Sequence, residues 1–400
     1  MDLNRKKLII YISAGIIILG VIGFILYRFL FPAQPAKEAV VPGRISGGMP
    51  SASGGITTPQ TPEEQIRPET LKPGEEITVM DEQKLTRITD FPVIAPSLNK
   101  DEDKVLFYKK DGGDLWSSDF TGLTQEKISN ITIVGMIEAI WSPVRDRAAI
   151  FYLDNESKKG FLHIGTSSVT ILPQDIKSFS WSPDGKNIAY LTQKNDRLNL
   201  NIADSSAKNP KTIFTSPILD SQINWVTADK IAFQTAPSGF AEGFLFAFSR
   251  SAGTFNKIKG PLFGLDSLWS SDGSRILVNF TNTVGRNFSA GIINSAGKEE
   301  FLFNSPTLAQ KCVWADAKNM YCAVPKTVNP NTIWPDEYLR GEVNTSDRLV
   351  LIDLDQKAGQ TIFNEGEFDI SNLTLTKNKS HLFFVNRADG SLWVLKLKIK

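Results

Sequence analysis

The sequence predicts an all-β protein, a seven-bladed β-propeller with four antiparallel strands in each blade, and two observations support this prediction. A unit made of Trp or Leu, a short polar turn and an apolar run recurs along the chain, and strand-like segments fill the intervals between its copies. The Trp or Leu stands at positions 98, 141, 181, 225, 269, 314 and 375, so successive steps are 43, 40, 44, 44, 45 and 61 residues. A period of about 40–45 residues of strand-like sequence is typical of propeller blades.

The third repeat shows how one unit divides into four strands. A first strand, Ile176–Trp181, is followed by the turn Ser182–Gly185 and a second strand, Asn187–Leu191. A polar turn containing Asp-Gly between two apolar runs is a strong signal for a β-hairpin. Leu198–Ala203 and Lys211–Thr215 supply the third and fourth strands. Each repeat is therefore expected to form one four-stranded antiparallel blade.

The two ends of the repeat array predict how the ring closes. The last repeat has a third strand at Leu392–Leu397 but no segment that could serve as its outer strand. Before the first repeat, Lys84–Thr89 alternates polar residues with Leu and Ile, as the outer strands do elsewhere. We expect this N-terminal strand to pair with the last blade, because the pairing removes an exposed sheet edge.

The best copy of the repeat has the sequence WSPDGKNIAY at Trp181–Tyr190, with partial copies at Trp141–Ile150 and Trp269–Val278. These repeats resemble the TolB-type, or PD40 (WD40-like), propeller repeat over roughly residues 84–400. The resemblance implies the fold but no particular ligand, since the family includes periplasmic scaffolds, lectin-like modules and the propeller caps of serine peptidases. The chain has no recognisable α/β domain before the repeats, and it has seven repeats where TolB-like modules have six, so the TolB partner is not carried over.

The N-terminal region predicts a membrane anchor. Leu8–Tyr27 contains no charged residue over twenty positions, which is long enough to cross the apolar core of a bilayer. Basic residues at positions 5–7 precede it, and only Arg28 follows closely, so we expect a cytoplasmic N-terminus and an extracytoplasmic propeller, either periplasmic or at the cell surface. The alternative is a cleaved signal peptide, but the apolar segment is long for one and Ala33 and Ala36 have the wrong spacing for a cleavage site. The expected segments are a cytoplasmic N-terminus at 1–7, a transmembrane signal-anchor helix at 8–30, a linker at 31–80 and the propeller at 82–400.

The linker is rich in Pro, Gly, Ser, Thr and Glu and has few residues able to form a core. Such a segment is expected to be disordered, because it cannot bury enough apolar surface to offset the loss of chain entropy. It is interpreted either as a tether that lets the propeller search near the membrane or, preferably, as a spacer without a sequence-specific role.

Composition and motifs exclude several functions. The 44 basic and 43 acidic residues leave no net field that would attract nucleic acid. Nucleotide-binding, zinc-protease and serine-hydrolase motifs are absent from the sequence, and the two histidines, His163 and His381, have no neighbouring motif partner. We therefore predict no catalytic residues, no cofactor and no metal site.

The two cysteines lie on either side of one predicted turn. Cys312 and Cys322 are equally far from position 317, the centre of the turn Asp316–Asn319. A hairpin centred there places them directly opposite each other, close enough for a disulfide. The alternative is a pair of reduced cysteines packed as small apolar residues.

One long insertion, Lys326–Asp347, accounts for the 61-residue step. It should lie on the propeller face formed by the loops between second and third strands, and it contains Trp334, Tyr338 and Arg340, residue types that often anchor interfaces. Phe240 and Arg286 on neighbouring loops are candidates to extend this surface. In the alternative interpretation Trp334 folds down onto the propeller as a local plug.

A second candidate site is the central channel. The residues three positions before the repeated Trp are expected to line it, and they mix acid, amide and base; they are Glu138, Ser178, Gln222, Asp266 and Lys311. Such a ring can hold a small polar ligand or a cation, although it more often holds ordered water.

Two functions follow from these features. The first is a non-catalytic, membrane-tethered scaffold that docks a protein or cell-wall component through its loop face. The alternative is a sensor of small ligands or glycans, or a weak hydrolase, that uses the central channel. The sequence assigns no oligomeric state.

Overall fold

The computed structural model describes residues 69–70, 72–73 and 85–398. The chain divides into two units, Met1–Glu64 and Gln65–Lys400, and all described residues belong to the second. A search of these residues finds no helix with the length and apolar character needed to span a bilayer. The predicted cytoplasmic residues 1–7 and the predicted anchor at 8–30 lie outside them, as does most of the predicted linker.

The described residues form six hydrogen-bonded sheets, of which the first three hold four antiparallel strands each. The first sheet contains β4 (Val93–Leu98), β5 (Val105–Lys109), β6 (Leu115–Ser118) and β7 (Gln125–Lys127). The second contains β8 (Met136–Trp141), β9 (Arg147–Asp154), β10 (Ser157–Ile164) and β11 (Ser168–Ile171). The third contains β12 (Ile176–Trp181), β13 (Asn187–Lys194), β14 (Arg197–Asp204) and β15 (Lys211–Ser216).

A long strand joins the next two repeats into one sheet. This sheet contains β16 (Ser221–Trp225), β17 (Lys230–Thr235), β18 (Glu242–Ser249), β19 (Phe255–Trp269), β20 (Arg275–Thr281), β21 (Ser289–Asn294), β22 (Glu299–Leu302) and β1 (Glu69–Thr70). The first part of β19 pairs with β18 as an outer strand, and its last part pairs with β20 as an inner strand. The seven sequence repeats are therefore distributed over six continuous sheets.

The remaining sheets complete the described unit. The fifth contains β23 (Cys312–Trp314), β24 (Asn319–Pro325), β25 (Asp347–Asp353), β26 (Ala358–Phe363) and β2 (Lys72–Pro73). The sixth contains β27 (Ile370–Leu375), β28 (His381–Asn386), β29 (Leu392–Lys396) and β3 (Leu85–Arg87). Two short helices lie between strands, a 3-10 helix at Ala309–Lys311 and α2 (Asp336–Leu339).

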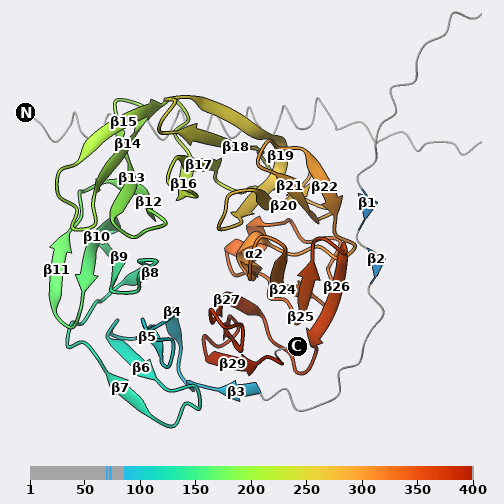
Figure 1. Ribbon diagram of the computed structural model, residues 1–400, viewed down its shortest axis with the longest axis horizontal. Coiled ribbons are helices and arrows are strands. Elements are labelled where there is room, and N and C mark those ends of the chain that lie inside the picture. Colours follow the sequence, from blue (N-terminus) through green and yellow to red (C-terminus); the bar gives the residue numbers. More distant parts are fainter. Residues whose placement is uncertain (1–68, 71, 74–84, 399–400) are drawn as a thin grey trace, which may run out of the picture. The chain divides into compact units, whose positions relative to one another are not determined.

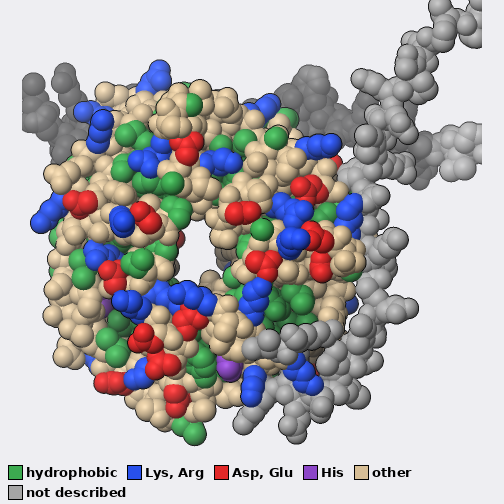
Figure 2. All heavy atoms as spheres, in the orientation of Figure 1, with side chains coloured by type: hydrophobic (Ala, Val, Ile, Leu, Met, Phe, Trp, Pro, Cys, Tyr) green, Lys and Arg blue, Asp and Glu red, His purple; other side chains and the backbone are tan. Residues whose placement is uncertain are grey.

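The sheets stand side by side around a central opening, with β4, β8, β16 and β27 nearest to it (Figure 1). The opening is also seen in the space-filling view, where acidic and basic side chains are interspersed over the visible face (Figure 2). Apolar clusters fill the spaces between neighbouring sheets. Phe151 packs with Trp181 between the second and third sheets, and Phe107 packs with Phe383 between the first and the last. This last cluster joins the two ends of the array.

The Ser-x-Asp-Gly turns hold their hairpins by local hydrogen bonds. In the third sheet the Ser182 hydroxyl donates to Asp184 Oδ1 at 2.6 Å and accepts from the amide of Asn187 at 2.9 Å. Gly185 has φ of 69°, a backbone conformation that favours glycine. A Cβ atom there would also lie 3.0 Å from Ser142 Oγ in the preceding turn, so the same glycine allows adjacent turns to pack.

Three tryptophans of the repeated column bond to the inner strand of the preceding repeat, whereas the indole nitrogens of Trp225 and Trp269 are buried without a hydrogen-bond partner. The indole nitrogen of Trp141 donates to Ala95 O at 2.8 Å, and that of Trp181 donates to Ile140 O at 2.9 Å. Trp314 makes the equivalent bond to Leu268 O at 3.2 Å. A large apolar side chain with one donor suits this position, because the ring fills the space between sheets while its N–H satisfies a carbonyl of the inner strand.

The predicted pairing of the N-terminal strand with the last repeat is confirmed. Strand β3 pairs antiparallel with β29, with Leu85 opposite Leu395 and Arg87 opposite Trp393. The Ile88 amide continues the ladder by donating to Leu392 O at 2.8 Å, and the Ile88 side chain is buried. Strands from opposite ends of the described unit thus share one sheet.

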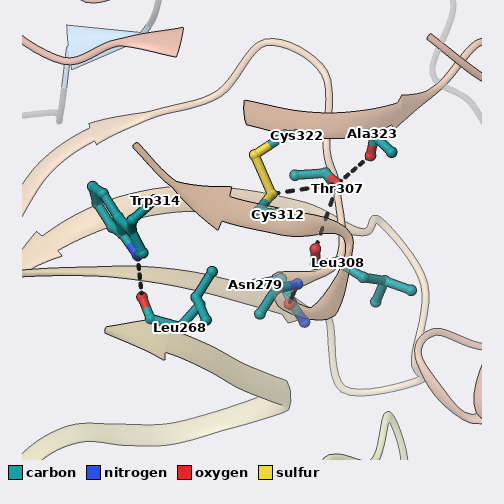
Figure 3. Close-up of a disulfide and its surroundings, with 9 residues drawn as sticks. Leu268, Asn279, Thr307, Leu308, Cys312, Trp314, Cys322 and Ala323 are labelled. Atoms are coloured by element: carbon teal, nitrogen blue, oxygen red, sulfur yellow. Dashed lines mark hydrogen bonds between the residues drawn. A yellow bond between two sulfur atoms is a disulfide. The ribbon is translucent and has the colours of Figure 1, made fainter. Parts of the chain in front are cut away.

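The structure pairs the two cysteines as the sequence predicts. Cys312 on β23 lies directly opposite Cys322 on β24, with Cα atoms 4.1 Å apart, and a disulfide joins them (Figure 3). Both side chains are buried in the core between the fourth and fifth sheets. Thr307 lies beside the bridge and donates its hydroxyl to Ala323 O at 2.6 Å.

Four residues of the predicted linker differ from the expectation of an unstructured segment. Glu69–Thr70 pairs in parallel with β22, and Lys72–Pro73 pairs in parallel with β26. The physical reason is that β22 and β26 are outer strands of their repeats, so their outward N–H and C=O groups are free to accept another strand.

Candidate functional site

The insertion crosses from its own sheet to the loops of two preceding repeats. Asp336, the first residue of α2, accepts hydrogen bonds from the Ser238 hydroxyl at 2.9 Å and the Gly239 amide at 2.6 Å. The Trp334 amide donates to Gly285 O at 2.8 Å. Gly239 and Gly285 are themselves in such close contact that a Cβ on the first would lie 2.6 Å from the Cα of the second. Three loops from three different repeats thus meet at one junction.

The two aromatic residues of the insertion lie below this junction and not on its surface. Trp334 and Tyr338 are both buried. Trp334 stacks on Phe288 with ring centroids 4.9 Å apart and packs with Leu308. These contacts correspond to the alternative interpretation of the sequence, in which Trp334 acts as a local plug.

Other side chains form the exposed surface of the junction. Phe240 is 64% exposed, Val284 53% and Leu339 45%, and each belongs to one of the three loops that meet there. We refer to these three residues as the loop-face patch. The predicted surface residues Arg286 and Arg340 are also exposed, and Arg340 forms an ion pair with Glu342 at 2.7 Å.

Beneath the insertion lies a fully buried group of charges. Lys311, which the sequence places in the channel ring, has no exposed side-chain surface. Its ammonium group lies 2.6 Å from Asp347 Oδ2 and 2.7 Å from Asp369 Oδ1, and it donates to the Thr345 hydroxyl at 2.7 Å. The expectation that Lys311 lines the channel is therefore wrong. The 3-10 helix that precedes β23 carries this lysine, and buried carboxylates from β25 and the start of β27 surround its ammonium group.

Tyr338 and Arg387 extend the buried group toward the channel. The Tyr338 hydroxyl donates to Asp369 Oδ1 at 2.8 Å, and the Arg387 guanidinium lies 4.2 Å from the centre of the Tyr338 ring. Arg387 also donates to Tyr338 O at 2.5 Å and lies 3.8 Å from Asp369 Oδ2. Burial raises the pKa of Asp347, and the neighbouring Lys311 ammonium opposes this rise.

The other four channel candidates occupy separate environments. Glu138 is exposed and pairs with Lys158 at 3.2 Å, and Gln222 is exposed on β16. The Ser178 hydroxyl accepts from the Ile223 amide at 2.9 Å, which joins two neighbouring sheets. Asp266 accepts from Gln234 at 2.8 Å, and burial raises its pKa. The structure does not gather these side chains into one ligand-binding group.

A hollow beside the channel is formed where β4, β8 and β27 meet. One cavity of about 530 Å³ includes Lys110, Gln310 and Arg387 in its lining. An adjoining cavity of about 340 Å³ includes Glu138 and Trp141. The two share Ile94, Ala95, Ile137 and Asn372, so we refer to them together as the channel hollow.

The histidines have structural surroundings. His163 is buried, its Nδ1 lies 2.9 Å from the Tyr108 hydroxyl oxygen, and burial lowers its pKa. His381 Nδ1 lies 2.8 Å from Ser380 Oγ, and its ring packs on Phe120. Among the residues that the structure describes, no group of three or more His, Cys, Asp or Glu is placed to hold a metal ion.

The sequence did not indicate Asp347 and Asp369 as partners of Lys311, or Arg387 as a partner of Asp369. The available signal was the lysine itself, the one basic residue among the five channel candidates. A buried lysine requires carboxylate partners, but the periodicity does not show which ones fold over it.

No family model matches this sequence, and no curated protein matches it. Solved structures do resemble it. Oligogalacturonate lyase from Vibrio parahaemolyticus is 13% identical with a TM-score of 0.54, and the match covers 80% of this chain and 95% of the other. An oligogalacturonate lyase in complex with manganese is 12% identical with a TM-score of 0.58, covering 80% and 94%. The β-propeller domain of the Trilobed protease from Pyrococcus furiosus is 14% identical with a TM-score of 0.53, covering 77% and 96%.

The fold is a β-propeller. At 12–14% identity the likeness concerns the fold alone. The propeller therefore provides two candidate sites on the side of the loops between second and third strands. They are the loop-face patch and the channel hollow, and Tyr338 and Leu339, neighbours in α2, contribute to one each.

Proposed function

We propose that this protein is a non-catalytic scaffold that binds a protein partner through the loop-face patch. The observation that carries this proposal is the junction of three loops, which presents Phe240, Val284 and Leu339 above a packed base. Exposed apolar side chains that lie together are typical of interaction sites. The hydrogen bonds of Asp336 to Ser238 and Gly239 hold the loops before binding, which lowers the entropy cost of association.

Trp334 and Tyr338 support this surface in the proposal. Their stacking holds α2 against the propeller, so that Leu339 and Arg340 are presented from a fixed element. Arg286 and Arg340 would form the polar rim that commonly surrounds an apolar contact. A protein or a cell-wall component remains the expected partner.

The number of blades, the membrane anchor and the cellular compartment belong to the same proposal. We divide the eight-stranded sheet at β19 into two blades, which makes seven blades of the TolB-like type. The segment at 8–30 would anchor the propeller outside the cytoplasm, with residues 1–7 inside. The Cys312–Cys322 disulfide supports such a compartment, because disulfides persist in oxidising environments.

The alternative function is ligand binding at the channel, and the channel hollow favours it. Two of the matched structures are oligogalacturonate lyases. A weak enzymatic activity of this chain is thus the competing proposal. It is tested by incubating the purified full-length protein with oligogalacturonate and measuring unsaturated product by absorbance, and the scaffold proposal expects no product.

Crosslinking on intact cells tests the scaffold proposal directly. A photoreactive benzophenone amino acid is placed at position 240 of the full-length chain, and the crosslinked products are compared with those obtained from position 171. Ile171 is a matched control because it is 70% exposed and lies on the outer strand β11. We expect a discrete adduct only from position 240, and Leu339→Ser should reduce its yield severalfold. Identical products from both positions would overturn the proposal.

A further inference from the structure

The channel hollow has the size of a small-molecule site. Its two adjoining cavities, of about 530 Å³ and about 340 Å³, fall in the range of volumes that ligand pockets occupy. Three inner strands that are far apart in sequence, β4, β8 and β27, form much of its walls, and loops and α2 complete the larger cavity. It adjoins the loop-face patch through Tyr338 and Leu339 of α2, but the two sites share no residue, so the inference does not rest on the proposed scaffold function.

The backbone of the hollow is irregular at matching places in two sheets. Strand β4 is bulged between Ile94 and Ser97, and β27 is bulged between Ser371 and Thr374. Within these bulges Ala95 has φ of 48° and Asn372 has φ of 52°. Register shifts also occur in the inner strands β8, β12 and β19, so a bulge at this place is a repeated feature of the fold. Left-handed conformations of residues other than glycine persist only where the surroundings enforce them. The bond from Trp141 to Ala95 O is one such constraint.

Both charged residues that line the larger cavity are basic. Lys110 is exposed in the turn after β5, and Arg387 follows β28. The bonds from Arg387 to Tyr338 O and Val343 O hold its guanidinium in place. Among the described residues lining this cavity there is no carboxylate, and the Glu138 that lines the adjoining cavity is paired with Lys158. Behind the cavity, Arg387 lies 3.8 Å from the buried carboxylate of Asp369, and together with Lys311 and Asp347 these residues form a balanced group of two cations and two carboxylates. The larger cavity therefore favours a negatively charged group chiefly through Lys110.

The remaining lining is mostly apolar, with a few amides and hydroxyls. Val93, Ile94, Met136 and Ile137 form an apolar wall, while Gln310 and Asn372 offer polar groups. We propose that the channel hollow binds a small organic carboxylate with an apolar body. The carboxylate lies toward Lys110 and Arg387, and the apolar body lies against Ile94 and Ile137.

Titration calorimetry of the full-length protein with 2-naphthoate tests this site, with the uncharged 2-naphthylmethanol as the comparison ligand. We expect one saturable site for the carboxylate and binding about tenfold weaker for the alcohol, the effect of losing one charge-assisted contact. Binding of the carboxylate should also weaken as salt increases. Absence of saturable binding at millimolar naphthoate, or equal affinity for the two compounds, would overturn the proposal.

Variants locate the site. Lys110→Gln should weaken naphthoate binding about tenfold. Lys177→Gln is the matched control, because Lys177 is exposed on the inner strand β12 and does not line the hollow.

A second variant tests the polar part of the lining. Asn372→Gly keeps the left-handed backbone, since glycine accepts positive φ, and removes only the side-chain amide. This variant should fold normally and bind naphthoate more weakly. Phe240→Ser should leave the affinity unchanged. Loss of binding in Phe240→Ser but not in Lys110→Gln would move the site to the loop-face patch and refute the inference.

Discussion

The Ser-x-Asp-Gly turns and the Lys326–Asp347 insertion satisfy their polar groups in opposite ways. In the turns, Ser182 and Asp184 bond to amides within five residues, and the carboxylate stays in water. Beneath the insertion, Lys311 meets Asp347 and Asp369, 36 and 58 residues away, in a site without water-accessible side-chain surface. Local contacts make the turn repeatable, whereas distant contacts make the insertion specific to one blade. Four experiments test this difference.

The largest effect is expected from Lys311→Met. Removing the ammonium group leaves Asp347 and Asp369 buried without their main counter-charge, and breaking a buried ion pair in this way costs about 3–5 kcal/mol. Urea denaturation of the variant should show this loss in the free energy of unfolding. Lys177→Met, on an exposed position of β12, should change it by less than about 0.5 kcal/mol.

A double variant tests whether Lys311 and its two aspartates act as one group. Adding Asp347→Asn to Lys311→Met should recover part of the lost stability, because one of the two unpaired charges disappears. If the losses of the two single variants simply add, the charges do not act as a group.

A smaller effect is expected from the turns. Ser182→Ala removes the hydroxyl that bonds both Asp184 and the Asn187 amide, and we expect a loss of about 1 kcal/mol. Ser270→Ala should have a similar effect, because Ser270 makes the same bonds to Asp272 and the Arg275 amide. Thermal unfolding monitored by circular dichroism gives both values. A change in one turn but not the other would show that the two copies of the motif are not equivalent.

The smallest expected effect is on the pH dependence of stability, which should have opposite signs for Asp272 and Asp347. The hydrogen bond from Ser270 lowers the pKa of Asp272, so this group contributes stability that is present above its unfolded pKa of about 3.9 and is lost as pH falls through the lower folded value. Burial raises the pKa of Asp347 above its unfolded value of about 3.9. As pH falls toward that value, the folded state binds the proton before the unfolded state does. The contribution of Asp347 to stability therefore grows as pH falls through this window. The stability differences between wild type and Asp272→Asn, and between wild type and Asp347→Asn, should therefore change in opposite directions between pH 3 and 6. If both stability differences changed in the same direction, the opposite pKa shifts of Asp272 and Asp347 would be contradicted.

Much of the architecture was predictable because its causes are local. The Trp column, the turn motif and the alternation of apolar residues each act within a few residues or between adjacent repeats, so a periodic pattern reports them. The opposition of Cys312 and Cys322 followed from counting outward from one turn, and the pairing of β3 with β29 followed from counting strands. The continuity of β19 across two repeats was not predictable, since no signal marks where an outer strand runs on into the next inner one.

The sequence by itself determined the repeated strands, the turns between them, the strand that completes the last sheet and the place of the one irregular loop. Only the tertiary structure decided that Trp334 and Tyr338 face inward, that Lys311 is buried with two distant aspartates, and that the hollow lies between β4, β8 and β27. The physical reason is the range of the interactions. Hydrogen bonds within a turn and apolar alternation along a strand depend on neighbours in the chain, whereas the partners of a buried charge and the walls of a cavity depend on which segments the closed ring brings together.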